Sequence, residues 1–186
     1  MPIVDDLLGR YKGASGAFVE TGTFLGDGVR RAIEAEFDAI YSIEINADLV
    51  ELNRGTFKAY EQVTIVHGDS SRDLGALLAR VRAPITYWLD GHYSANPLTG
   101  YNPAHLSPVL SELEQIRAHR VANPQLGDPI ILIDDVRLFR CSSDRLDGHF
   151  QLSLDAVLAK LSTICPAYRF TYAEGIQKDD ILIAHP

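Results

Sequence analysis

The sequence is poor in cysteine and has no long apolar run, and each shortage excludes a class of protein. Among its 186 residues the two cysteines, Cys141 and Cys165, form no CxxC pair. Neither a disulfide framework nor a cysteine zinc site is therefore expected. No apolar stretch is long enough to cross a bilayer, and the first residues lack the basic and apolar segments of a signal peptide. A reduced, cytoplasmic protein without a membrane partner is expected.

Positive charge is also scarce in this chain. Lys and Arg total 17 against 25 Asp and Glu, which gives a formal net charge of -8 at pH 7. A surface that follows nucleic-acid phosphates needs an excess of positive charge, so no nucleic-acid partner is expected. The length suits a single domain spanning residues 1–186, because no repeat, low-complexity tract or linker divides the chain.

Short β-branched or aromatic runs alternate with longer segments of helical period. The expected strands are 16–21, 39–45, 63–69, 85–90, 129–135, 168–174 and 179–185. The expected helices lie near 27–37, 47–60, 71–82, 106–121 and 151–163. This alternation predicts an α/β fold with a Rossmann-like, doubly wound, mostly parallel seven-stranded sheet. The short link GIQKD before the last strand predicts a hairpin, so one C-terminal strand should run antiparallel.

The segment FVETGTFLGDGVRR predicts a strand, a glycine turn and the start of a helix. Gly22 allows a sharp turn and a close approach of a ligand to the backbone, while Gly26 and Gly28 allow close packing. This spacing is not GxGxxG, which weakens an interpretation as a NAD or FAD site. A purely structural turn between strand and helix remains the alternative.

Polar residues end the second and third expected strands. Glu44 lies about 20 residues after the turn, where a Rossmann-type site places an acid on ribose hydroxyls. Asp69 and Ser70 follow the third strand, where they could hydrogen-bond a base, or could simply cap the next helix. Both interpretations of Asp69 and Ser70 remain open.

The stretch PIILIDDVRLF ends a buried strand on two adjacent carboxylates, Asp134 and Asp135. Desolvating two like charges costs several kcal/mol unless a cation or hydrogen bonds compensate. A positive partner is therefore expected nearby.

Five of these motifs occur in an order that resembles a known family. They are VETGTFLGDG, YSIEIN, HGDS, YWLDGHY and ILIDDVRLF. Together they resemble class I S-adenosylmethionine-dependent methyltransferases, and more narrowly the metal-dependent O-methyltransferases of the catechol type and of the macrocin or aminocoumarin sugar type. The resemblance covers the chain from about Gly16 to Phe139.

The resemblance implies a role for each residue along this edge of the sheet. The residues that would line the methionine part of S-adenosylmethionine are Glu20, Thr21, Gly22 and Thr23. Phe24 would pack near the sulfonium, since an aromatic face attracts positive charge. Glu44 would hold the ribose, and Asp69 and Ser70 would flank the adenine. Asp90 would meet both the cofactor and the metal.

The resemblance also implies a divalent cation held by Asp90, Asp134 and Asp135. Neighbouring parallel strands lie about 4.8 Å apart, so carboxylates at their ends can share one ion. Asp134 and Asp135 can both reach it only if the chain leaves the strand there. Oxygen ligands favour magnesium, with manganese or calcium as alternatives, over zinc. Otherwise the two acids make backbone hydrogen bonds at a turn, and Asp90 meets only the cofactor.

The expected base is His92, because sugar-type relatives carry a base close to this position and an imidazole suits proton removal. Tyr93 stands where the catechol type has a lysine, so a flat catechol acceptor is disfavoured. Weaker candidates for acceptor contacts are His105, Arg137 and His149. The expected acceptor is a small hydroxylated molecule such as a sugar or natural product.

Two other functions compete with this interpretation. A NAD-type Rossmann oxidoreductase would explain Glu44 but not the glycine spacing or the acids, and a catalytically silent cofactor-binding protein would leave the metal site unused. The chain shows few N-terminal segments that could cover the sheet, which leaves room for a homodimer.

Overall fold

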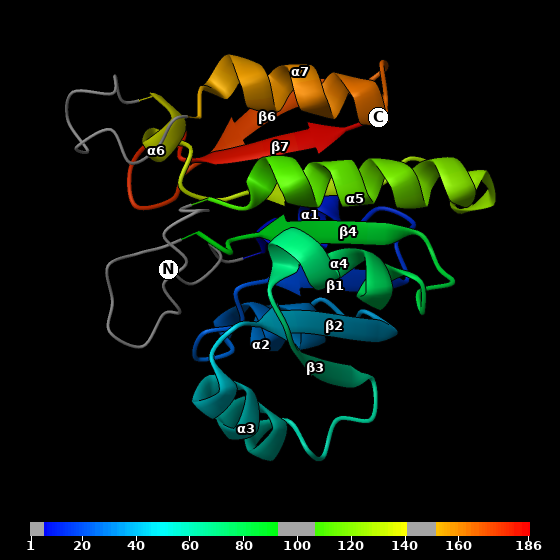
Figure 1. Ribbon diagram of the computed structural model, residues 1–186, viewed down its shortest axis with the longest axis vertical. Coiled ribbons are helices and arrows are strands. Elements are labelled where there is room, and N and C mark those ends of the chain that lie inside the picture. The colour runs from blue at the N-terminus through cyan, green and yellow to red at the C-terminus, as the bar shows by residue number, and fades with distance from the viewer. Residues whose placement is uncertain (1–5, 93–106, 141–151) are drawn as a thin grey trace.

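A computed structural model describes residues 6–92, 107–140 and 152–186 of the protein. Its described strands form one seven-stranded sheet in the order β3-β2-β1-β4-β5-β7-β6 (Figure 1). Their bounds are β1 Ala17–Thr21, β2 Ala39–Glu44, β3 Val63–His67, β4 Ile85–Leu89, β5 Ile130–Ile133, β6 Arg169–Ala173 and β7 Ile181–His185. Strand β7 runs antiparallel to both β5 and β6. The predicted α/β fold and its C-terminal hairpin are confirmed.

Eight helical segments flank this sheet in the described part of the chain. Five match the predicted helices: α2 Asp27–Glu34, α3 Ala47–Thr56, α4 Ser70–Leu78, α5 Val109–Ala122 and α7 Leu154–Ile164. Three short ones were not predicted: α1 Leu7–Tyr11, the 3-10 helix η1 Pro124–Leu126 and α6 Arg137–Arg140. Leu7 and Leu8 of α1 are buried against the sheet, so the N-terminus covers more of it than the sequence suggested.

The two faces of the sheet carry separate apolar cores. Helices α4, α5 and α7 pack on one face, with Val19 and Tyr87 from the central strands beneath them (Figure 1). Helices α1, α2 and α3 contribute to the other core, which contains Phe18 and Trp88. Because β1 and β4 are covered on both sides, their side chains are buried throughout, as is usual for central parallel strands. Trp88 is a core residue.

Side-chain caps explain where three of the helices begin. Asn46 accepts hydrogen bonds from Asp48 N at 2.8 Å and Leu49 N at 3.3 Å, so α3 starts at Ala47. Asp69 caps α4 and Ser153 caps α7 in the same way. The helix predicted over 47–60 ends earlier, at Thr56, and Phe57 is its buried C-cap residue.

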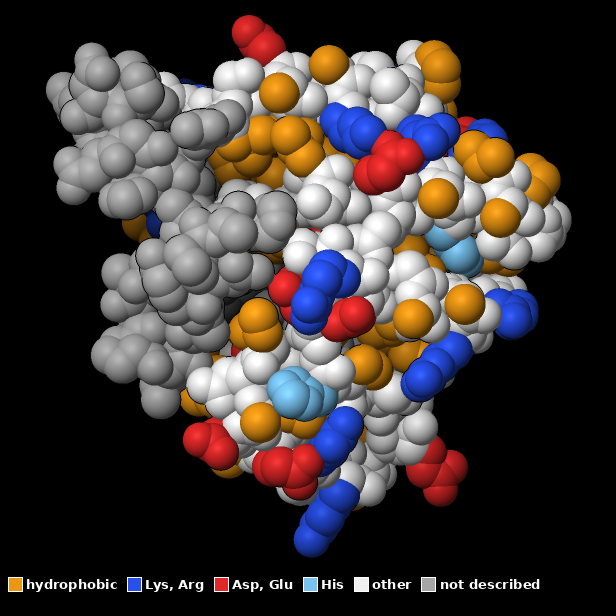
Figure 2. Space-filling model, viewed as in Figure 1, with side chains coloured by type: hydrophobic (Ala, Val, Ile, Leu, Met, Phe, Trp, Pro, Cys, Tyr) orange, Lys and Arg blue, Asp and Glu red, His pale blue; other side chains and the backbone are white. Residues whose placement is uncertain are grey.

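The face formed by α4, α5 and α7 carries mixed charge. Figure 2 shows Lys or Arg side chains beside Asp or Glu side chains over these helices, among the residues that are described. The ion pairs include Arg117 with Glu114 and Lys160 with Glu114. Within the described ranges, no helix combines the length and the apolar character that a bilayer span requires.

Candidate cofactor and metal site

The topology brings the predicted site residues to one edge of the sheet. The chain proceeds from β1 through β2 to β3 on one side and from β4 to β5 on the other, so a switch point lies between β1 and β4. Backbone hydrogen bonds continue past the strand ends, from Gly22 N to Ile43 O at 2.9 Å and from Asp90 N to Thr21 O at 3.1 Å. Ligands of open α/β sheets bind outside such carboxyl ends.

Gly22 makes the closest backbone approach at this edge. Its φ is +82°, and a Cβ built on it would lie 2.5 Å from the carbonyl oxygen of Asp90. Both the left-handed backbone and the missing side chain are therefore required. The glycine predicted from the sequence is needed to fit the turn after β1 against the loop after β4.

Replacing Gly22 by alanine should lower the free energy of unfolding by about 2–4 kcal/mol, from left-handed strain and overpacking against a backbone atom. Gly55 in α3 is the matched control, because a Cβ there has nothing within 4 Å. Gly55→Ala should be neutral or stabilising by up to about 1 kcal/mol. Urea unfolding of both variants tests this, and equal stability of the two would contradict it.

Glu44 ties the turn after β1 to the end of β2. Its Oε2 accepts a hydrogen bond from Phe24 N at 2.9 Å, and its Oε1 accepts one from Asn46 N at 2.9 Å. The residue is 5% exposed, and Phe24 holds a left-handed φ of +46°. Each carboxylate oxygen can accept a further bond, so Glu44 can still bind a ribose diol. That role stays a prediction, as does the place of Phe24 beside the sulfonium.

Glu20 and Thr23 point into the protein and meet at Ser42, which sequence reasoning missed. Ser42 Oγ donates to Glu20 Oε2 at 2.5 Å and lies 2.6 Å from Thr23 Oγ1. Burial raises the pKa of Glu20 well above its ordinary value, despite the hydrogen bond from Ser42. A Cβ at Gly28 would lie 1.7 Å from Glu20 Oε1, so this glycine leaves the acid its space under α2. The sequence could have indicated Ser42, because it is a polar residue inside an otherwise apolar strand.

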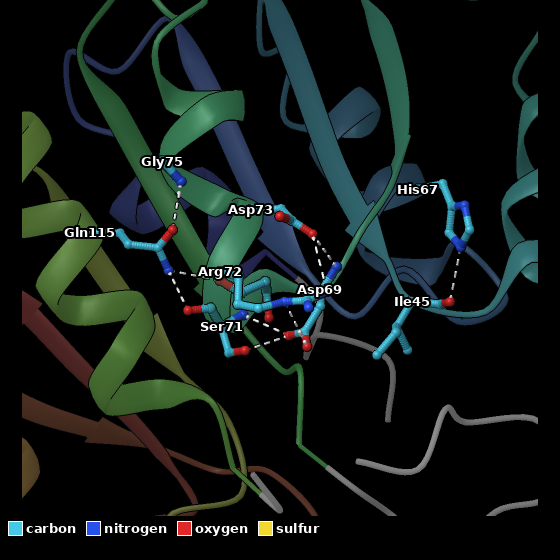
Figure 3. A network of polar contacts seen from close by, with 9 residues as sticks. Ile45, His67, Asp69, Ser71, Arg72, Asp73, Gly75 and Gln115 are labelled. Carbon is cyan, nitrogen blue, oxygen red and sulfur yellow. Dashed lines mark hydrogen bonds and ion pairs between the residues drawn. The ribbon is translucent and has the colours of Figure 1, made fainter. Parts of the chain in front are cut away.

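Asp69 caps helix α4, as one of its two interpretations required. Its Oδ1 accepts from Ser71 N at 3.0 Å and from Ser71 Oγ at 2.6 Å, and Arg72 lies 3.4 Å from its other oxygen (Figure 3). The cap leaves the base-binding roles of Asp69 and Ser70 untested. Ile45, directly after Glu44, is 38% exposed and offers an apolar surface that the sequence did not single out.

Gln115 of α5 holds the first turn of α4 (Figure 3). Its Oε1 accepts from Gly75 N at 2.7 Å, and its Nε2 donates to Ser70 O at 2.8 Å and Ser71 O at 3.1 Å. The side-chain amide of Gln115 thus binds the carbonyl oxygen of Ser71 and the backbone N–H of Gly75, which are four residues apart in α4. The packing of α5 therefore sets the position of the α4 N-terminus at the edge of the site.

The chain leaves strand β5 at Asp134 and Asp135. This is the condition under which both acids could reach one metal ion. Strand β5 ends at Ile133, and Asp135 has a left-handed φ of +59°. Asp134 Oδ1 accepts from the backbone N of Asp135 at 2.8 Å. Asp134 and Asp135 are 4% and 5% exposed, so the structure buries both acids instead of leaving them to water.

His92 and Arg137 contact the buried acids and can supply the positive charge that these acids need. His92 Nδ1 lies 3.2 Å from Asp90 Oδ1, and His92 Nε2 contacts Asp135 Oδ2. Arg137 bridges Asp135 and Asp180, a fully buried acid that sequence reasoning missed. Arg137 was predicted only as a weak candidate for acceptor contacts.

These contacts set the pKa values of the cluster. Burial lowers the pKa of His92, but hydrogen bonds and charges of Asp135 and Asp90 outweigh it and raise the pKa to about 10. Burial, with the charges of Asp90 and Asp135, raises the pKa of Asp134 to about 7. The pKa of Asp135 is lowered below its ordinary value, because His92 and Arg137 outweigh its burial.

The acids also fit a divalent cation. Ligand atoms of Asp90, His92 and Asp135 all lie within 4.8 Å of one another, and so do those of Asp134, Asp135 and Asp180. The predicted trio of Asp90, Asp134 and Asp135 is thus divided between two groups that share Asp135. The carboxylate oxygens suit a hard cation such as magnesium. The loop candidates His105 and His149 lie outside the described residues.

Comparisons with known proteins bear on the fold. No protein-family model matches the sequence, and no curated protein does. Solved structures do match. An O-methyltransferase from Bacillus cereus, in complex with S-adenosylhomocysteine, has a TM-score of 0.59 at 11% identity, over 96% of this chain and 76% of the other. The O-methyltransferase TomG from Streptomyces achromogenes, in complex with S-adenosylmethionine, has a TM-score of 0.57 at 15% sequence identity. The match covers 96% of this chain and 75% of TomG.

An N-methyltransferase, NodS from Bradyrhizobium japonicum, also matches, with a TM-score of 0.53 at 12% identity over 95% of this chain and 88% of the other. The chain therefore has the Rossmann-like fold of class I S-adenosylmethionine-dependent methyltransferases, and its structural neighbours include O-methyltransferases. Likeness at this level of identity concerns the fold and leaves the acceptor atom open.

Proposed function

We propose that this protein is an S-adenosylmethionine-dependent O-methyltransferase that acts on a small hydroxylated acceptor, a sugar or natural product, with a divalent cation at the acidic cluster. The observation that carries the proposal is the convergence of the Gly22 turn, the carboxylate of Glu44 and the buried acids on one edge of the sheet. Such an edge can hold a nucleoside cofactor beside a cation site.

The residues divide into two halves along this edge. Glu44, at the end of β2, would accept hydrogen bonds from the ribose, and the exposed side chain of Ile45 would give the base an apolar contact. Asp69 and Ser70 would meet the adenine, and Gly22 would let the methionine part approach the backbone. Asp90 lies at the boundary, because its backbone touches the Gly22 turn and its carboxylate contacts His92.

Asp90, Asp134 and Asp135 would hold the cation, with His92 or Asp180 close enough to complete the set. When bound, the cation would supply positive charge that lowers the pKa of an acceptor hydroxyl and orients it toward the methyl group. Both ring nitrogens of His92 are engaged by carboxylates in this structure. His92 can serve as a base only when Asp90 and Asp135 have another positive partner.

Calorimetric titration with S-adenosylmethionine and with NAD separates the proposal from an oxidoreductase. Binding of S-adenosylmethionine and S-adenosylhomocysteine, with none of NAD, is the expected result, since the turn after β1 has no pyrophosphate spacing. A screen of hydroxylated acceptors with magnesium then tests turnover by mass spectrometry. Tight binding of NAD alone would refute the proposal, and cofactor binding without any methylated product would favour a catalytically silent binding protein.

A further inference from the structure

Two buried oxygen atoms near the Gly22 turn have no hydrogen-bond partner of ordinary geometry among the described residues. Glu112, in the first turn of α5, is 1% exposed, and Thr21, the last residue of β1, is 0% exposed. Glu112 Oε1 and Thr21 Oγ1 make no hydrogen bond of ordinary geometry among the described residues. Buried polar atoms are nearly always paired in folded proteins, so two such atoms at one place call for an explanation.

Both oxygen atoms lie beside Gly91, two residues after the end of β4. A Cβ built on Gly91 would lie 3.1 Å from Glu112 Oε1 and 3.2 Å from Thr21 Oγ1. A side chain at Gly91 would therefore crowd both oxygen atoms. Gly91 lies next to Asp90, whose carbonyl oxygen faces Gly22, so the two oxygen atoms lie close to the turn where the cofactor is proposed to bind.

The carboxyl group of Glu112 has no Lys or Arg partner among the described residues. Burial raises the pKa of Glu112 to about 7, although the neighbouring hydroxyls of Ser70 and Thr21 and the charge of His92 act in the opposite direction. A buried carboxylate without a countercharge is stabilised most by a hydrogen-bond donor that also carries positive charge.

We propose that Glu112 Oε1 and Thr21 Oγ1 accept hydrogen bonds from the ammonium group of the amino-acid part of S-adenosylmethionine. The inference rests on the proposed function and adds a binding residue, Glu112, that the sequence did not indicate. An ammonium group offers three donors and a positive charge, so it can satisfy a carboxylate and a hydroxyl together. The exocyclic amine of adenine is a donor without charge and would leave the buried acid unmatched.

The test compares two ligands that differ in the amino-acid part. S-Adenosylhomocysteine carries the ammonium group, whereas 5′-methylthioadenosine keeps the nucleoside and thioether without it. Glu112→Gln should weaken S-adenosylhomocysteine about 10-fold or more, as expected when a charged hydrogen bond is lost, and change 5′-methylthioadenosine less than about twofold. Thr21→Val, which removes only the hydroxyl, should act in the same direction with a smaller effect.

Glu114→Gln is the matched control, because it makes the same change on the exposed side of the same helix. It should leave both affinities unchanged. Calorimetry gives the affinities, and thermal melts establish that each variant is folded; if Glu112→Gln does not fold, Thr21→Val alone decides.

Unchanged binding of S-adenosylhomocysteine by the folded variants would overturn the inference. Equal weakening of both ligands would overturn it too, because Glu112 would then act on the nucleoside through Ser70 and α4. Failure of the unmodified protein to bind either ligand would instead refute the proposed function, so the two failures can be told apart.

Discussion

Removing divalent cations with a chelator should abolish methyl transfer and leave the affinity for S-adenosylhomocysteine largely intact. The reason is the separation of the two halves of the site. Asp134, Asp135 and Asp180 form a buried group at the end of β5, whereas the ribose partner Glu44 ends β2. Calorimetry with S-adenosylhomocysteine, with and without chelator, tests the second part of this expectation.

Asp135→Asn should weaken magnesium binding by at least about 10–100-fold, the range seen when the surroundings of a metal site are disturbed. An amide still accepts a hydrogen bond, but it carries no charge. Asp128→Asn is the control, since Asp128 pairs with Arg120 before β5 begins and has no part in the acidic cluster. Magnesium at millimolar concentration should raise the melting temperature of the unmodified protein and of Asp128→Asn, and raise that of Asp135→Asn less.

The structure also defines the result that would refute the metal site. His92 and Arg137 already compensate Asp135, so the acids can be tolerated without an ion. If magnesium, manganese and calcium leave the melting temperature unmoved and turnover persists in chelator, the acids are structural. The cluster would then be a buried ion-pair network that holds the loops after β4 and β5 together.

Glu44→Ala should weaken S-adenosylmethionine and S-adenosylhomocysteine more than about 100-fold. Two charge-assisted hydrogen bonds to the ribose would be lost, each at about 1.5–3 kcal/mol. The same change also frees Phe24 N and Asn46 N, so the turn after β1 loses its support. Calorimetry on the folded variant provides the measurement.

Glu44→Gln separates the loss of ribose hydrogen bonds from the loss of support for the turn after β1. Its amide keeps one oxygen acceptor for the backbone and replaces the other oxygen by a donor. An affinity between those of Glu44→Ala and the unmodified protein is expected. Glu51→Ala, an exposed change in the following helix, is the control for a general effect of charge. Unchanged affinity of Glu44→Ala would contradict the assignment of this residue to the ribose.

The alternation of strands and helices and the closing hairpin could be predicted from the sequence because their signals are local. A strand of apolar β-branched residues, a glycine turn and an N-cap residue such as Asn46 or Asp69 each act within a few positions. Once the sheet is parallel, the carboxyl ends of its strands lie at one edge by topology. The positions of Gly22, Glu44, Asp90 and Asp134 at that edge follow from this pattern.

The tertiary structure alone decided which groups neutralise one another there. Arg137 and Asp180 are 43 residues apart, and Gln115 contacts a helix turn 40 to 45 residues earlier. The carboxylate of Glu112 lies near Thr21 and Gly91, 91 and 21 residues away in the sequence, only because the first turn of α5 lies at the same edge of the sheet. The sequence by itself determined the order of the elements and the edge that holds the site, since local periodicity and turn chemistry encode both. The partners of each buried charge depend on packing between distant segments, which no local pattern specifies.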